Sequence, residues 1–178
     1  MITKTYSQPE IKASLQASFQ DNAQFVASIS DEDFSKKKNE KWSIAENFDH
    51  LIMSNKPLAS GLKRAKIFFR AFGTAKNPSR KYEKIVAIYK ETLLTKNPTN
   101  NAFLSKDVAT MSKEQYLSNW KMIGEKYQER LDTWNEKDLD KYRIPHPVLG
   151  KLTVREMMFF TINHNYHHLE IMKEYLKL

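Results

Sequence analysis

Histidines carry the clearest chemical signal in the 178-residue sequence, because three of its five histidines occur within Asn163–Leu169. On a helix, residues four apart lie one turn above each other on the same face, so His164 and His168 can direct both imidazoles at one ion. His167 falls on a different face, and we expect it at the surface or at the mouth of a site. The pair predicts a metal site that needs a further ligand.

Two histidines elsewhere are candidates for that ligand. His50 shares a stripe of small and polar residues suited to lining a cleft: Asn47, Ser54, Pro57 and Gly61. His146 precedes the last predicted helix on a proline-flanked loop, as a ligand or a pocket residue. With no cysteine, only His and carboxylates remain as strong ligands. Spacing alone also fits two hydrogen-bonded core histidines, so both interpretations stay open at this point.

The elements that must position these histidines have clear starts. A hydroxyl residue followed three positions later by Glu or Gln satisfies backbone donors in the first helical turn, and this pattern occurs at Ser43, Ser112 and Thr153. Glu46, part of the first such pattern, is expected to cap the helix, with orientation of His50 as the alternative. Apolar residues at helical spacing predict four long helices and one short accessory helix. Their approximate ranges are 9–29, 44–72, 113–134, 154–176 and, for the accessory element, 80–94.

Composition agrees with an all-α fold. Only 4 Gly and 6 Pro occur among 178 residues, whereas apolar residues make up 40%. Four amphipathic helices bury their apolar stripes most simply against one another, so we predict a four-helix bundle as a single domain over 1–178. We expect Pro57 to kink or break the second helix, helices to hold over half of the chain, and no sheet between Lys41 and Leu178.

The formal charge of +8 raises the question of anionic partners. Basic residues gather at 36–38 and are spread between apolar residues over 63–84, a pattern that we interpret as solvated helix surface. We therefore expect neither nucleic acid nor membrane as a partner. Met1–Glu10 lacks the apolar run of a leader, and no stretch is long enough to span a bilayer, so we expect a cytoplasmic protein.

Two sequence blocks resemble the DinB/YfiT-like family. Lys41–Ile52 reads K-W-S-I-A-E-N-F-D-H-L-I and is similar to the W-S-x-x-E-x-x-x-H-L block of that family. His146–Met157 reads H-P-V-L-G-K-L-T-V-R-E-M and, with His164 and His168-Leu169, is similar to its H-P-x-x-G-x-L-T-x-R-E block and closing H-x-x-x-H-L. The resemblance implies a four-helix bundle that holds one divalent metal ion, usually nickel or zinc, through His50, His164 and His168.

The resemblance also implies two functional hypotheses. The first is a metalloenzyme that activates water or an external low-molecular-weight thiol for attack on a small electrophile, of hydrolase or thiol S-transferase type. The alternative is a non-catalytic metal-binding or interaction protein. Asn165 and Tyr166 are expected around the pocket. Phe159 and Tyr166 lie on the polar side of the last predicted helix, and exposed aromatic residues there favour a homodimer, with cover by a loop as the alternative.

Overall fold

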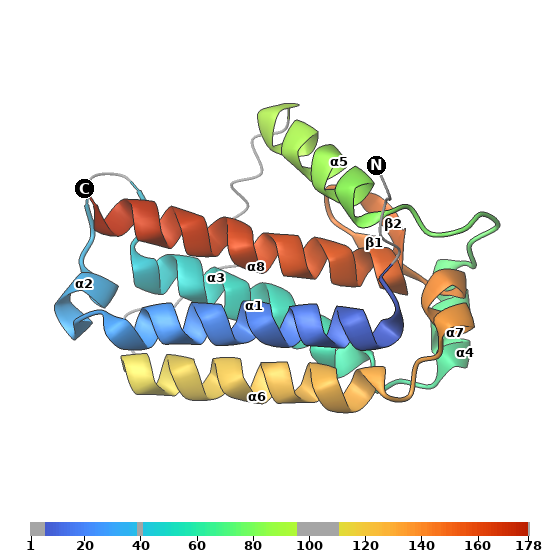
Figure 1. Cartoon of the computed structure of the whole chain (residues 1–178), viewed down its shortest axis with the longest axis horizontal. Coiled ribbons are helices and arrows are strands. Elements are labelled where there is room, and N and C mark those ends of the chain that lie inside the picture. The colour runs from blue at the N-terminus through green and yellow to red at the C-terminus, as the bar shows by residue number, and fades with distance from the viewer. Residues whose placement is uncertain (1–5, 39–40, 96–110, 178) are drawn as a thin grey trace.

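Four long helices lie side by side along the molecule (Figure 1). The computed structural model describes residues 6–38, 41–95 and 111–177, and helices hold 73% of these residues. The helix α1 packs against α6 and α8, and α3 packs against the same two helices, which closes a four-helix bundle. The predicted fold class is confirmed. The bundle helices are α1 (Gln8–Ser28), α3 (Ile44–Gly61), α6 (Lys113–Leu131) and α8 (Val154–Leu176).

All three predicted helix starts are confirmed. The side chains of Ser43, Ser112 and Thr153 each accept a hydrogen bond from the backbone N–H three residues later. In return, the residue at that third position accepts from the backbone of the cap. A fourth capping box, between Ser7 and Glu10, starts α1. These local contacts depend only on neighbouring residues, so sequence was sufficient to find them.

The second helix is shorter than predicted. Pro57 lies inside α3 without ending it, and the helix stops at Gly61 instead of continuing to Phe72. The short α4 (Lys66–Phe69) and the 3-10 turn η1 (Arg70–Phe72) follow. The backbone oxygen of Leu62 accepts a hydrogen bond of 3.2 Å from the indole of Trp134, a tertiary partner that takes the place of a further helical turn.

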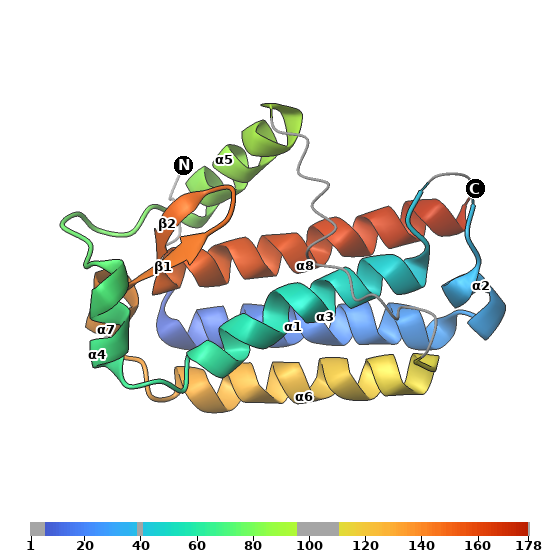
Figure 2. The same ribbon diagram turned by 180° about the vertical axis from the view of Figure 1, so that it is seen from behind.

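The expectation of no sheet is wrong at one place. Strands β1 (Arg143–His146) and β2 (Gly150–Thr153) form an antiparallel hairpin directly before α8. Gly150 has a φ of +75°, a conformation that glycine adopts without steric cost. A two-stranded hairpin this short does not alter the helical class, but it lies beside the start of α8 (Figure 2), and His146 of β1 contacts the ring of Phe160 on that helix.

Three further helices lie outside the four-helix bundle. The predicted accessory element is α5 (Tyr82–Thr95), which crosses α8 on the outside of the bundle (Figures 1 and 2). The short α2 (Asp31–Ser35) and α7 (Glu136–Lys141) were not predicted. In the described part of the chain, no helix is long and apolar enough to cross a membrane.

Aromatic side chains fill the centre of the bundle. Trp120 of α6 stacks on Phe19 of α1, with ring centroids 4.1 Å apart, and its indole N–H donates to the backbone oxygen of Phe19. Phe48 of α3 contacts the same indole at 5.2 Å. The predicted stripe of the third helix is fully buried, with members Tyr116, Trp120, Ile123, Tyr127, Leu131 and Trp134.

The aromatic pair expected at a subunit contact is placed differently. Phe159 is buried within one chain, between the rings of Tyr6 and Tyr82, so its expected exposure is wrong. A helical wheel for α8 takes no account of α5 and the N-terminal segment, which cover this side. Tyr166 is half-buried and donates to Asp21 on α1. The homodimer stays a prediction, without support from Phe159.

Two ion pairs, each between a buried residue of α8 and a more exposed partner, hold the first turn of α8. Arg155 is 4% exposed and donates to Asp140 at 2.7 Å, while Glu156, also 4% exposed, accepts from the guanidinium of Arg80 at 2.9 Å. Burial opposes ionisation of Glu156, but hydrogen bonds from Arg80 outweigh it and hold the pKa of this carboxyl below its usual value. Burial likewise opposes ionisation of Asp140, and Arg155 lowers its pKa overall.

These lowered pKa values predict acid sensitivity. A carboxylate whose pKa is lower in the folded than in the unfolded state stabilises the fold above its unfolded pKa, and this stabilisation is lost as the pH falls through the folded pKa. The free energy of unfolding should therefore decrease below about pH 4.5, the unfolded value for Glu156. Urea unfolding at a series of pH values measures it. Glu156→Gln should flatten the profile, and an unchanged slope would contradict this assignment.

Candidate metal centre

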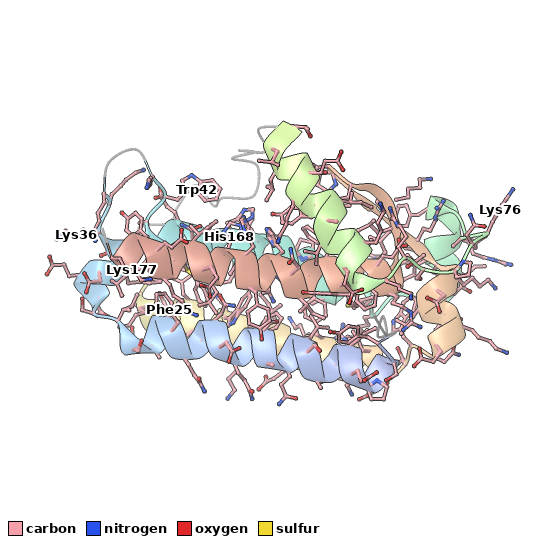
Figure 3. All side chains as sticks on the ribbon, turned by 45° about the horizontal axis from the view of Figure 1, so that its top comes forward. Phe25, Lys36, Trp42, Lys76, His168 and Lys177 are labelled. Carbon is pink, nitrogen blue, oxygen red and sulfur yellow. The ribbon has the colours of Figure 1, made fainter. Side chains whose placement is uncertain are left out.

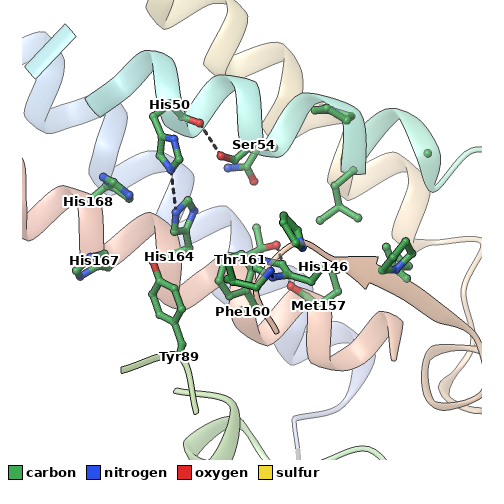
Figure 4. A pocket seen from close by; sticks show the side chains of 18 of the residues that line it. His50, Ser54, Tyr89, His146, Met157, Phe160, Thr161, His164, His167 and His168 are labelled. Carbon is green, nitrogen blue, oxygen red and sulfur yellow. Dashed lines mark hydrogen bonds between the residues drawn. The ribbon is translucent and has the colours of Figure 1, made fainter. Parts of the chain in front are cut away.

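Three histidines from two helices converge on one point (Figure 4). His50 lies on α3, one turn after the capping box, and faces His164 and His168 on α8. The Nε2 atoms of His50 and His164 are 3.1 Å apart, and one ring nitrogen from each of the three residues lies within 4.8 Å of the others. The structure therefore brings together all three residues that were predicted as metal ligands.

Asn47 fixes the tautomer of His168. The side-chain nitrogen of Asn47 donates to the backbone oxygens of Ser43 and Trp42, at 2.9 and 3.3 Å. Its side-chain oxygen is therefore the atom that faces Nδ1 of His168, 3.0 Å away. An oxygen acceptor requires a protonated Nδ1, which leaves the lone pair of His168 on Nε2. This nitrogen is the one available to an ion.

Burial keeps these imidazoles neutral. His164 is 6% exposed and His168 is 7% exposed. Burial lowers the pKa of both side chains well below the usual value, and the neighbouring histidines lower it further. A neutral imidazole has a free lone pair, which is the form that binds a metal.

The three donors fit a divalent ion. In a tetrahedral site with bonds of about 2.0 to 2.1 Å, two ligating nitrogens lie about 3.3 Å apart. The 3.1 Å between His50 and His164 is close to that separation, and a ring nitrogen of His168 lies within 4.8 Å of the other two. Three imidazole nitrogen donors suit zinc or nickel, and they leave coordination positions open, as in catalytic rather than structural sites.

The three histidines lie in the wall of a cavity of about 990 Å³. Tyr89 of α5 covers one side, with its ring 6.1 Å from that of His164, and Phe160 stacks on His164 at 5.0 Å. The small and polar stripe of α3 lines the cavity as predicted. Tyr89 was not predicted, because its helix has no motif that links it to the histidines.

The two remaining histidines also line the cavity. His146 lies on β1, where Nδ1 accepts hydrogen bonds from the backbones of Val148 and Leu149 and the ring packs on Phe160. Burial lowers the pKa of His146 to about 4. His167 is half-buried against Tyr89, which matches its expected place at the mouth of the site. Neither belongs to the cluster of converging nitrogens.

Three neighbouring residues have roles away from the ligands. Glu46 caps α3 and pairs with Lys37, so its expected capping role is confirmed. Asn165 is fully buried and its side chain bonds to Ser18 and Asn55 between the bundle helices, which makes its expected place around the pocket wrong. Tyr166 also lies on the α1 side of α8, where Phe25 is found, whereas Trp42 and His168 lie on the cavity side (Figure 3).

The contact between Asn47 and His168 predicts a loss of metal affinity. Asn47→Leu removes the acceptor that holds Nδ1 of His168, and loss of such an outer partner costs about 10- to 100-fold in affinity. Competition titration against a zinc chelator measures the dissociation constant. Asn47→Asp is the matched control, because it also loses the donor to Ser43 but keeps an acceptor oxygen. Equal losses in both variants would show that the hydrogen bond from Asn47 to the backbone of Ser43, and not the contact of Asn47 with His168, determines the metal affinity.

The fold and the site define a class of helical-bundle proteins with a three-histidine centre in the wall of a large cavity. The model of the DinB superfamily matches residues 11–172. The chain therefore belongs to the DinB superfamily, and the family resemblance found in the sequence is confirmed.

A solved structure has the same fold over most of the chain. It is YfiT from Bacillus subtilis, described as a probable metal-dependent hydrolase with an unusual four-helix bundle topology. The two chains are 16% identical, with a TM-score of 0.64, and the match covers 94% of this chain and 85% of YfiT. No curated protein matches the sequence. At this identity the likeness to YfiT establishes the shared fold.

Proposed function

We propose that the protein is a metal-dependent enzyme that acts on a small electrophile, with water or an external low-molecular-weight thiol as the nucleophile. The observation that carries the proposal is the convergence of three imidazoles, from His50, His164 and His168, in the wall of a cavity of about 990 Å³. The DinB superfamily membership and the description of YfiT as a probable metal-dependent hydrolase support it. The proposed ion is zinc or nickel.

The proposed partner is a small molecule. A concave site of several hundred Å³ with mostly apolar walls and few polar groups is typical of small-molecule binding. A bound divalent ion supplies Lewis acidity, which makes a water or thiol nucleophile available near neutral pH. Because the chain has no cysteine, any thiol must come from a cosubstrate.

The protein's own residues prepare this chemistry. Among the described residues, the cluster consists of the imidazoles of His50, His164 and His168 alone and includes no carboxylate. Asn47 holds the ring of His168 in one tautomer. Tyr89 and Phe160 pack against His164 and exclude water from one side of the site, which strengthens electrostatic interactions within it.

The proposal is tested first on metal content and then on turnover. Protein purified without a histidine tag is analysed for metal, stripped, and reloaded with zinc or nickel. Hydrolysis of p-nitrophenyl acetate and conjugation of cysteine with monochlorobimane then test the two nucleophiles. We expect turnover in at least one assay that clearly exceeds that of the metal-free protein, because a bound ion makes the nucleophile available near neutral pH.

His164→Ala serves as the control for the assays, because it should abolish the metal-dependent part of the rate. If the loaded protein binds one ion firmly but accelerates neither reaction, the function is metal binding without this catalysis. If no ion binds, the enzyme proposal fails at its first step.

A further inference from the structure

The cavity extends well beyond the histidines. Its wall includes Trp42, just before α3, and Gly61, the last residue of α3. His50 and Gly61 are eleven residues apart on this helix, which corresponds to about 16 Å at a rise of 1.5 Å per residue. Lining residues continue past Gly61 to α4 and η1. A ligand that reaches from the histidines to that end must be elongated.

Most of the wall beyond the histidines is apolar. It comes from four parts of the fold, α3, α4 with η1, α5 and the β1–β2 hairpin. Such walls favour a ligand with a long hydrocarbon or aromatic body, because contact removes apolar surface on both sides from water. The apolar lining residues of this part include Leu58, Phe68, Phe72, Leu93, Ile144 and Val148.

Charge is distributed unevenly along the cavity. Three charged side chains line it among the described residues: Lys41, Arg64 and Glu174. Lys41 and Glu174 have opposite charges and lie at the end where the start of α3 meets the end of α8 (Figure 2). The positive charge of Lys41 and the negative charge of Glu174 therefore offset each other in their effect on a singly charged ligand. Arg64 is the charged residue at the opposite end.

No carboxylate in the described part of the chain pairs with Arg64. Residues 50–82 contain neither Asp nor Glu, and the nearby Asp138 of α7 pairs with Lys66. The guanidinium of Arg64 lies over the ring of Phe68, 4.9 Å from its centroid, which is a cation–π contact. Arg64 is exposed, as is Phe68, so the geometry places an unpaired, solvent-accessible cation at the rim of the apolar wall.

We propose that the cavity binds a molecule with a long apolar body and one anionic group, and that Arg64 binds the anionic group. One part of this proposal rests on the proposed function: because the reaction is placed at the histidines, the end of the ligand opposite its anionic group is the end that reacts. Binding of the anionic end does not depend on a metal. A carboxylate matches the planar guanidinium, which offers two parallel N–H donors.

The test compares decanoate with decanol on the metal-free full chain. Without a metal, the carboxylate has no competing site on an ion, so any preference reports on the cavity's own charges. Isothermal titration below the micellar concentration gives both dissociation constants. We expect decanoate to bind up to about fivefold more tightly than decanol, the upper end for an exposed ion pair. Hexanoate, with a shorter apolar body, should bind more weakly than decanoate.

Two adjacent substitutions provide the matched comparison. Arg64→Gln should remove the preference for decanoate and leave decanol binding unchanged. Lys63→Gln removes the same charge one residue away, from an exposed side chain that does not line the cavity, and should keep the preference. Equal binding of the two probes to the unaltered protein, or equal effects of the two variants, would overturn the proposal.

The outcome is separate from that of the proposed function. Zinc binding is measured on the same preparations by equilibrium dialysis, and Arg64→Gln should leave it unchanged. Loss of the decanoate preference with normal zinc binding supports the proposal. Absence of zinc binding with an intact preference would reject the metal enzyme and keep the anionic apolar ligand. If neither probe binds, the apolar cavity is not the binding site and the proposal is wrong.

Discussion

Replacing His168 by alanine is expected to remove almost all bound zinc or nickel. The variant retains His50 and His164, but two imidazoles do not close a site that needs three protein ligands. We expect the bound metal to fall from about one ion per chain to less than a tenth, with an affinity loss of more than 100-fold, the upper end for loss of an outer partner. Elemental analysis after dialysis measures the first value and chelator competition the second.

His167→Ala is the matched control for this prediction. It removes the imidazole of the residue that precedes His168 in the sequence. His167 lines the same cavity but lies outside the cluster of three converging histidines. The substitution should leave the stoichiometry unchanged. Both variants should fold, because the apolar stripes of four helices supply most of the stability of a chain of this length. Equal metal loss in both variants would show that His167 belongs to the site.

The parts of the fold that sequence predicted correctly depend on local contacts. Helix starts at Ser43, Ser112 and Thr153 are encoded within four residues, and the apolar stripe of each bundle helix follows from its period. The end of α3 was not predictable in this way, since it depends on a hydrogen bond from Trp134, 72 residues away. The predicted exposure of Phe159 was wrong for the same reason, because the side chains that cover it, Tyr6 and Tyr82, are distant in the sequence.

In the candidate site, too, the residues that sequence could predict are those that depend on local spacing. Helical spacing placed His164 and His168 on one face but left core histidines as an alternative to metal ligands, and His50 needed the family resemblance, because spacing left His146 as an alternative. The structure places His146 in the cavity wall but outside the cluster. The contact of Asn47 with His168 joins residues 121 positions apart and depends on the orientation of two side chains. No local pattern predicts such a contact.

Trp120→Ala is expected to cause the largest loss of stability among single substitutions in the bundle. The indole is 1% exposed, stacks on Phe19, contacts Phe48, and donates to a backbone oxygen. Truncation of a buried Trp to Ala costs about 3 to 5 kcal/mol through lost burial and the cavity that remains. This is a large share of the roughly 5 to 15 kcal/mol of a typical domain. Urea unfolding followed by circular dichroism measures the change in the free energy of unfolding.

Trp42→Ala is the comparison that separates bundle stability from the site. Trp42 is half-buried, lines the cavity and contacts the ring of His50 at 5.4 Å. Its loss should cost about 1 kcal/mol of stability, because the side chain already faces open space. In the Trp120→Ala variant, the metal affinity should stay within about tenfold of that of the unaltered protein as long as the variant is folded. The reason is that none of the three metal-binding histidines touches the ring of Trp120. If Trp42→Ala destabilises the protein as much as Trp120→Ala, the bundle centre contributes no more to stability than the wall of the cavity, and the prediction is wrong.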